Sequence, residues 1–304
     1  MKLKFILIAA MSALLSSLLA AEDNFEKLLE NYKNITSESL LAQREKKQSA
    51  VILKEKLDNT FLDDAMVAVP GKNYSILKTE VTQELYEFVM GKNPSYFGGE
   101  KNLPVEKVSW YDAVRFCNKL SEQEGLEPVY SVDGETDLGQ WSRDFPDEKM
   151  ECNESANGYR LPTVEEWQYA ANGGQAFKYS GSDNLQEVGW YGRTWDKTHP
   201  VAQKAPNGYG LYDMSGNVWE WCWDFAEDED YSGLFDDYDE LLESYPDLID
   251  DSYRDFLNAK STRYICGGCW GSIDETCEVG NHLADYASIG SAFTGFRIAC
   301  NVSK

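Results

Sequence analysis

The sequence predicts an α+β fold in which short helices precede a strand-rich C-terminal part. Three segments between residues 82 and 174 each begin with a helix-capping residue that apolar residues follow at helical spacing. The stretch 208–224, GYGLYDMSGNVWEWCWD, places three tryptophans at alternate positions, which share one face of a strand. The segments TRYICGGCWGS and GFRIACNVS, within residues 262–304, have the composition of strands joined by turns.

Length and composition limit the class of protein. The chain has 304 residues, 42% of them hydrophobic, which suffices for a sizeable core in one large domain or two small ones. Its formal charge of -24 argues against nucleic acid and anionic membranes as partners, because both repel an acidic surface.

The N-terminus has the pattern of a secretion signal. Lys2 and Lys4 precede an apolar run, residues 5–21, that ends in small residues. The run is short for a transmembrane anchor and contains serines, and no later segment could span a bilayer. We therefore expect residues 1–21 to be removed and the protein to be exported to the cell surface, the periplasm or the medium.

Two further segments differ from the globular part. Residues 22–60 are polar, with apolar positions near helical spacing, and predict a helical stalk or linker before a domain at 61–304. The segment from Phe225 to Phe256 carries thirteen acidic residues and a single basic one, Arg254. This composition predicts a solvated acidic insertion at about 225–260.

The three predicted helices have distinct signals. Thr82 is the expected N-cap of the first, and Gly91 follows its last residue. Ser109 is the expected cap of the second helix. Thr163 and Glu166 have the spacing of a capping box at the start of the third helix.

Seven cysteines follow the signal segment. Export permits disulfides, and the odd number leaves at least one thiol unpaired within the chain. Cys266 and Cys269 have redox or zinc spacing, but only His199 and His282 could complete a zinc site. The zinc interpretation is the less favoured one.

Several motifs occur in an order that indicates a known family. They are KTEVTQELYEFV (78–89), PVEKVSWYDAVRFCNKLS (104–121), GYRLPTVEEWQYAANGG (158–174), PNGYGLYDMSGNVWEWCWD (206–224), CGGCWG (266–271) and GFRIA (295–299). The chain resembles the formylglycine-generating-enzyme-like branch of the C-type lectin fold. This resemblance implies a loop-rich α+β domain with a small antiparallel sheet near the C-terminus.

The resemblance also allows the activity of the family to be tested against the residues. Its sulfatase-modifying enzymes oxidise a substrate cysteine with two cysteines that bind copper, and these positions fall on Ser272 and Cys277. One thiolate cannot supply a two-sulfur copper site. We therefore expect no catalytic residues and no copper, and a formylglycine-generating oxidase remains the alternative.

Residues 271–294, GSIDETCEVGNHLADYASIGSAFT, have a restricted composition. Only Glu275 and Glu278 cannot be reached from an asparagine codon by changing its adenines. The segment resembles the variable region of proteins that a retroelement diversifies, such as the variable proteins of Treponema. We place the candidate variable region at about 267–298.

This second resemblance implies a non-catalytic protein that displays diversified side chains on a rigid scaffold. The expected partner is a protein or a glycan, with protein favoured, and a structural cell-envelope protein without a variable site is a further alternative. The predicted ligand-binding residues are Gly271, Ser272, Ile273, Asp274, Asn281, His282, Leu283, Asp285, Tyr286, Ser288, Ile289, Gly290, Ser291, Ala292 and Phe293. Residues 271–274 and 281–293 should then share one solvent-exposed face.

The resemblance to the enzyme family further implies a structural calcium ion. Its ligands would be the carboxylates of Asp213 and Glu220 and the carbonyl oxygens of Gly216 and Val218. The alternative is that this stretch forms only core and turn.

Overall fold

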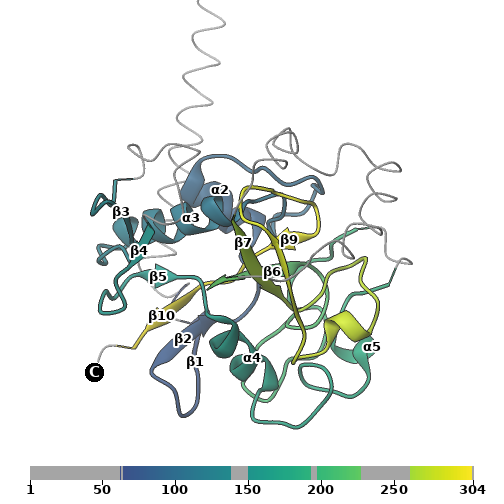
Figure 1. The fold of residues 1–304 in the computed structure, drawn as a ribbon. Helices are drawn as coiled ribbons and strands as arrows, with labels where there is room; N and C mark the ends of the chain where they lie inside the picture. The colour runs from purple at the N-terminus through teal and green to yellow at the C-terminus, as the bar shows by residue number, and fades with distance from the viewer. Residues whose placement is uncertain (1–61, 63, 138–149, 193–196, 227–260, 303–304) are drawn as a thin grey trace, which may run out of the picture. The chain divides into compact units, whose positions relative to one another are not determined.

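The computed structural model of the 304-residue chain describes residues 62, 64–137, 150–192, 197–226 and 261–302 (Figure 1). All of these lie in one compact unit that spans Phe61–Lys304. The predicted signal segment, the stalk and residues 227–260 of the acidic insertion lie outside the described residues. Within the described ranges, no helix combines the length and the apolar character needed to cross a membrane.

The three capped helices are confirmed. Thr82 and Ser109 accept hydrogen bonds at the starts of their helices, and Thr163 and Glu166 form the expected capping box. Gly91 ends the first helix in the left-handed conformation, at φ 80°, which glycine adopts without strain. The helices are α2 (Gln83–Met90), α3 (Trp110–Gln123), α4 (Val164–Asn172) and the short α5 (Leu185–Val188).

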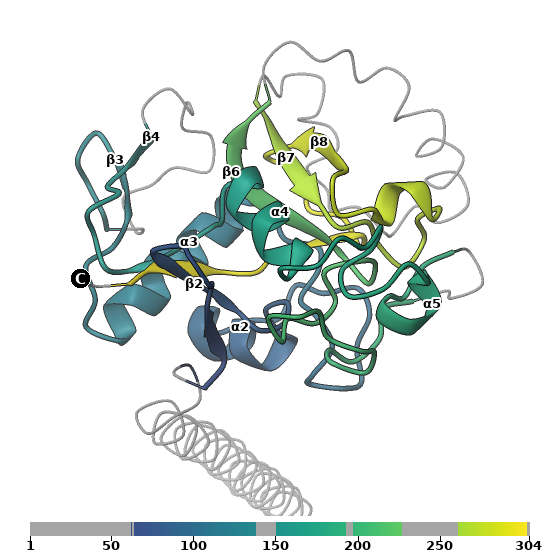
Figure 2. The ribbon, with the colours of Figure 1, turned by 90° about the horizontal axis from the view of Figure 1, so that it is seen from below.

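The described strands form two four-stranded sheets and one hairpin (Figure 2). The first sheet has the order β1-β2-β10-β5, the hairpin joins β3 and β4, and the second sheet has the order β8-β7-β6-β9. The strands are β1 (Met66–Ala68), β2 (Tyr74–Leu77), β3 (Tyr130–Val132), β4 (Met150–Cys152), β5 (Tyr159–Arg160), β6 (Trp219–Phe225), β7 (Thr262–Cys266), β8 (His282–Tyr286), β9 (Thr294–Gly295) and β10 (Ala299–Asn301).

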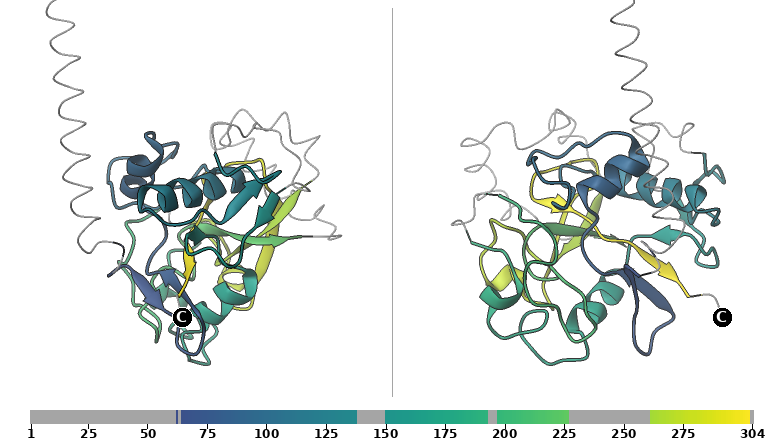
Figure 3. Two further views of the ribbon diagram at one scale, coloured as in Figure 1. Left: turned by 90° about the vertical axis from the view of Figure 1, so that its left-hand side faces the viewer. Right: turned by 180° about the vertical axis from the view of Figure 1, so that it is seen from behind.

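The expected small sheet near the C-terminus is the second one, and it is not wholly antiparallel. β6 and β7 pair antiparallel, as do β7 and β8, but β9 lies parallel to β6. The first sheet joins the start of the domain to its end, because β10 pairs with β2 (Figure 3). The sequence did not predict this sheet, whose strands have only two to four residues.

β6 is buried on both faces. Trp219 and Trp221 are buried on one side of the strand, and Glu220 and Cys222 are buried on the other. Trp167 of α4 donates its indole N–H to Glu220 at 2.6 Å, which joins the helix to the strand. Trp219 and Trp221 are therefore part of the core, and Trp223 is half-buried.

Candidate functional site

The candidate variable region begins after β7 and returns to β6 as β9. It contains a turn at 267–271, the short 3-10 helix η6 (Glu275–Cys277) and the edge strand β8 (Figures 1 and 2). The domain thus presents this region as the outer edge of its second sheet and the loops on either side.

Main-chain hydrogen bonds fasten the region to the rest of the domain. The amides of Lys107 and Trp110 donate to the carbonyls of Ser291 and Ala287, at 2.8 and 3.0 Å. Trp219 N donates to Phe293 O at 2.8 Å. Since these bonds use backbone atoms on both sides, they do not depend on the side chains that the region carries.

The predicted ligand-binding residues do not all share an exposed face. Ten of the fifteen are exposed or half-buried: Gly271, Ser272, Ile273, Asp274, Asn281, His282, Leu283, Asp285, Tyr286 and Ser288. Among the described residues, Ile273 is the most exposed large apolar side chain, at 64%. Only Ile273 and Asp274 are fully exposed and the other eight are half-buried, so the expected exposed face is present in part.

For the remaining five the expectation of exposure was wrong. Ile289, Gly290, Ser291, Ala292 and Phe293 are buried, with Ile289 and Phe293 only 6% and 7% exposed. The ring of Phe293 stacks on Trp270, with centroids 4.7 Å apart, and the Trp270 indole donates to Ala292 O at 3.0 Å. This part of the region is therefore core.

The two positions that correspond to the copper-binding cysteines lie beside a third sulfur. Ser272 Oγ donates to Cys269 Sγ at 3.4 Å and accepts from Cys269 N at 2.9 Å. Burial raises the pKa of Cys269 to about 11, and burial together with the nearby Cys269 raises the pKa of Cys277. Both thiols are therefore protonated at neutral pH, and Ser272 offers copper a hydroxyl where a second thiolate is needed.

Glu220 has a partner that the sequence did not reveal. Arg297 Nε and Nη2 donate to its two carboxylate oxygens at 2.5 and 2.6 Å, and both side chains are fully buried. Trp167 adds a third donor at 2.6 Å. The signal was Arg297 itself, a charged residue in the otherwise apolar segment GFRIA.

Glu220 does not therefore fit the predicted calcium ligand set, since the guanidinium occupies its carboxylate. Asp213 is different: it is buried, Oδ2 accepts from Ala202 N at 2.7 Å, and Oδ1 has no hydrogen-bond partner among the residues that the structure describes. Burial raises the pKa of Asp213 to about 6. Glu80, also missed from the sequence, lies nearby and accepts from Asn217 Nδ2 and Val218 N.

The buried carboxylates thus outnumber the buried cation. Glu80, Asp213 and Glu220 surround the single guanidinium of Arg297, and burial, then the charges of the other two acids, raises the pKa of Glu80. Such a cluster retains protons or attracts a further cation. In the described part of the chain, Asp213 Oδ1 is the one carboxylate oxygen of this cluster that is buried without a hydrogen-bond partner.

Comparison with known proteins places this geometry in a family. The model of the sulfatase-modifying factor enzyme 1-like domain matches residues 46–302. The solved structure of Treponema denticola variable protein 1 is similar, with a TM-score of 0.61 and 33% identity, over 78% of this chain and 91% of that one. The structure of CarF matches with a TM-score of 0.57 and 28% identity, over 76% and 87%.

Two similar proteins have names that indicate different activities. The chaperone protein LppX of Paenibacillus barcinonensis is 45% identical over 214 residues, 55% of this chain and 74% of that protein. The formylglycine-generating enzyme of Thermomonospora curvata is 31% identical over 216 residues, 66% of this chain but only 56% of the enzyme. The resemblance inferred from the motifs is confirmed, and the chain belongs to the family of sulfatase-modifying factor enzyme 1-like domains, with a C-type lectin-like fold.

Proposed function

We propose that the chain is an exported, non-catalytic binding protein that displays variable side chains at 271–288 on a rigid scaffold. The observation that carries this proposal is the similarity to Treponema denticola variable protein 1 over 78% of the chain. A protein surface is the favoured ligand, because exposed and half-buried apolar groups such as Ile273, Leu283 and Tyr286 supply anchors.

The fastening of the region supports the proposal. A diversified site needs a backbone that keeps its course when the side chains change, and the bonds from Lys107, Trp110 and Trp219 to the region are main-chain bonds. The buried stretch 289–293 then anchors the displayed residues to the core.

The coding DNA gives the decisive test. If a retroelement diversifies the region, the codons for its exposed positions should be of the NNY type, and a nearby template repeat should carry AAY codons at the same positions. A gene with no such repeat, and with third bases like those of the scaffold, would favour the structural cell-envelope protein.

A combined exchange of exposed and half-buried positions should change stability little. We expect no more than about 0.5 kcal/mol per site, because these side chains contribute little to the core. The exchanged residues are Ile273, Asp274, Asn281, His282, Leu283 and Tyr286. Urea unfolding measures the change.

Phe293→Ala is the matched control within the same region. It removes a buried ring and should lower the free energy of unfolding by about 3–5 kcal/mol. An exchange set that destabilises as much per site as Phe293→Ala would contradict the proposal of a tolerant surface.

The oxidase is the second candidate function, favoured by the similarity to the Thermomonospora curvata enzyme. We expect no aldehyde when the protein is incubated with Cu(I), oxygen and a sulfatase-type cysteine peptide, because Ser272 replaces a needed thiolate. Mass spectrometry of the peptide measures the product. Ser272→Cys restores the missing thiol and serves as the comparison, and turnover by the unaltered chain above copper alone would establish the oxidase.

We also propose a structural calcium ion held by Asp213, whose Oδ1 is buried without a partner, together with carbonyls of the same loop. Calcium at a hundredfold excess over its dissociation constant should add about 2.7 kcal/mol to the free energy of unfolding. Asp213→Asn should abolish this gain, since it removes the charge while suiting the left-handed backbone at φ 57°.

Glu220→Gln is the contrasting variant. Because Glu220 neutralises Arg297, its loss should lower stability equally in calcium and in chelator. Equal melting temperatures of the unaltered protein in calcium and in chelator would contradict the calcium site.

A further inference from the structure

Four asparagines of the chain are followed by a residue other than proline and then by serine or threonine: Asn34, Asn73, Asn153 and Asn301. In exported proteins such a triplet is the acceptor for a glycan attached to the asparagine side chain. Asn34 lies outside the described residues. The other three differ in exposure and in hydrogen bonding, so the structure separates an available acceptor from two that are held in place.

Asn153 is the available acceptor. It lies in the turn that follows β4, and both Asn153 and Ser155 are exposed. Ser155 Oγ donates to Asn153 Oδ1 at 2.6 Å, and Ser155 N donates to the same oxygen at 3.1 Å. The hydroxyl of the triplet therefore already polarises the amide that would take the glycan.

The nitrogen of the same amide faces a carboxylate at the surface. Asn153 Nδ2 donates to Glu127 Oε1 at 3.2 Å, and both residues are exposed. A carboxylate in this position favours loss of an amide proton, because it stabilises the positive charge that develops on the nitrogen when a bond forms there. Ser155 and Glu127 thus prepare the amide for transfer without burying it.

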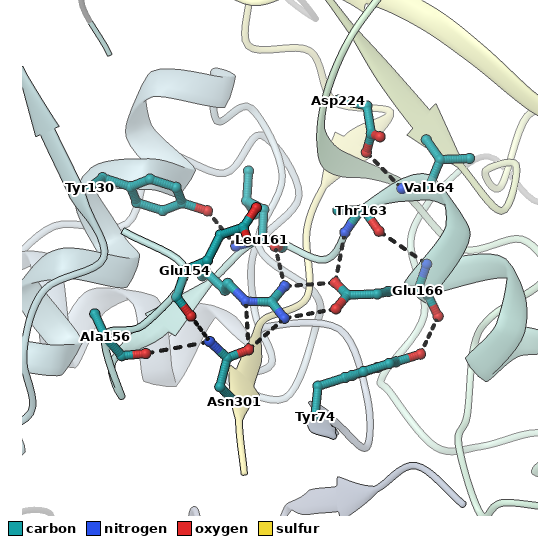
Figure 4. A network of polar contacts seen from close by, with 11 residues as sticks. Tyr74, Tyr130, Glu154, Ala156, Leu161, Thr163, Val164, Glu166, Asp224 and Asn301 are labelled. Atoms are coloured by element: carbon teal, nitrogen blue, oxygen red, sulfur yellow. Dashed lines mark hydrogen bonds and ion pairs between the residues drawn. The ribbon is translucent and has the colours of Figure 1, made fainter. Parts of the chain in front are cut away.

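Asn301 has the same triplet but its amide is fully engaged (Figure 4). Its Oδ1 accepts from Arg160 Nη2 and Nε, at 2.9 and 3.3 Å. Its Nδ2 donates to the carbonyl oxygens of Glu154 and Ala156, at 2.8 and 3.4 Å, and the residue is half-buried. A glycan on Nδ2 would replace one of these hydrogens, so the folded chain does not offer this nitrogen to a transferase.

Asn73 is exposed, but its hydroxyl partner is fixed in a strand. Ser75 belongs to β2 and lies opposite Ala68 of β1 on one side and Cys300 of β10 on the other. An extended backbone separates residues two positions apart by about 7 Å, which keeps the Ser75 hydroxyl away from the Asn73 amide. The central position of β2 in its sheet prevents the rearrangement that would bring them together.

We propose that the folded chain is glycosylated on Asn153 Nδ2 and not on Asn73 or Asn301, which rests on the export that is part of the proposed function. Nδ2 forms a bond to the anomeric carbon of a glycan that is carried on a polyprenyl diphosphate. The bond from that carbon to the diphosphate oxygen breaks, and the diphosphate leaves with the bonding electrons. Nδ2 gives up one proton to a base, and neither reactant is oxidised or reduced.

The position of Asn153 suits a protein that displays a binding face elsewhere. In Figure 2, the hairpin of β3 and β4 lies on the other side of β6 from β8, the edge strand of the candidate variable region. A glycan on the turn after β4 is bulky and hydrophilic, so it would shield this side of the domain from water-exposed contacts with other proteins. It would leave residues 271–288 free to bind.

Peptide mass spectrometry of the protein recovered from the envelope or the medium of the cells that naturally express it tests the proposal. Most copies of the peptide with Asn153 should show a mass increase equal to whole sugar residues, and the peptides with Asn73 and Asn301 should show none. The N-terminal peptide of the same sample reports whether residues 1–21 have been removed. Processed protein without sugar on Asn153 would overturn this proposal and leave export standing, whereas unprocessed protein without sugar would remove both.

Three exposed substitutions show whether the described turn is the acceptor. Ser155→Ala keeps the amide but lacks the hydroxyl, and it should abolish the modification, whereas Ser155→Thr restores a hydroxyl and should keep it. Asn153→Asp keeps an oxygen for Ser155 N and lacks the nitrogen, so it should abolish the modification with an unchanged melting temperature. Sugar that persists in Ser155→Ala, or sugar on Asn301 to the same extent as on Asn153, would contradict selection by this turn.

Discussion

Replacement of Arg297 by Met should lower the free energy of unfolding by about 3–5 kcal/mol, one of the two largest effects that we expect. The change leaves the carboxylate of Glu220 buried with a single remaining donor, Trp167, and removes the only cation of a cluster of three acids. Urea unfolding at neutral pH measures the loss.

The control for this variant is an exposed ion pair. Lys101 and Glu84 lie 3.4 Å apart with side chains 79% and 45% exposed, and Lys101→Met should change stability by less than about 1 kcal/mol. The double variant Arg297→Met, Glu220→Leu should recover part of the loss, because it removes the stranded charge. A loss for Arg297→Met no larger than that for Lys101→Met would show that the buried pair is unimportant.

Replacement of Trp221 by Ala should also lower the free energy of unfolding by about 3–5 kcal/mol. The ring is fully buried, and its indole donates to Val108 O at 3.0 Å. The alanine leaves a large cavity and an unsatisfied carbonyl. Thermal and urea unfolding both report this loss.

Phe225, at the end of the same strand, provides the comparison. It is 42% exposed, so Phe225→Ala should cost less than about 1 kcal/mol although it removes a ring of similar kind. Similar losses for the two variants would contradict the assignment of Trp221 to the core.

Local features of the fold could be predicted from the sequence because their causes are local. The caps at Thr82, Ser109 and Thr163 satisfy amides within three residues of themselves, and the alternation of tryptophans is a property of one strand. The sheet that joins β2 to β10 could not be predicted, since its strands are too short to show a period.

The partly wrong prediction of the binding face has a similar cause. The binding face was predicted from the restricted amino-acid composition of the region. Whether a residue is exposed depends instead on the groups that pack against it, such as Trp270 and Lys107. The pairing of Glu220 with Arg297 could not be predicted for the same reason, because the two residues are 77 positions apart. Tertiary contacts decided both outcomes.

The burial of residues 289–293 changes how large a repertoire this scaffold could carry. Each buried position reduces the number of different binding surfaces that the scaffold can present. A library with ten variable positions is therefore far smaller than one with fifteen. The same burial raises the fraction of variants that fold, because random residues no longer enter the layer beside Trp270. Under the proposed diversification, the scaffold would display fewer possible binding surfaces, but a larger share of its variants would fold.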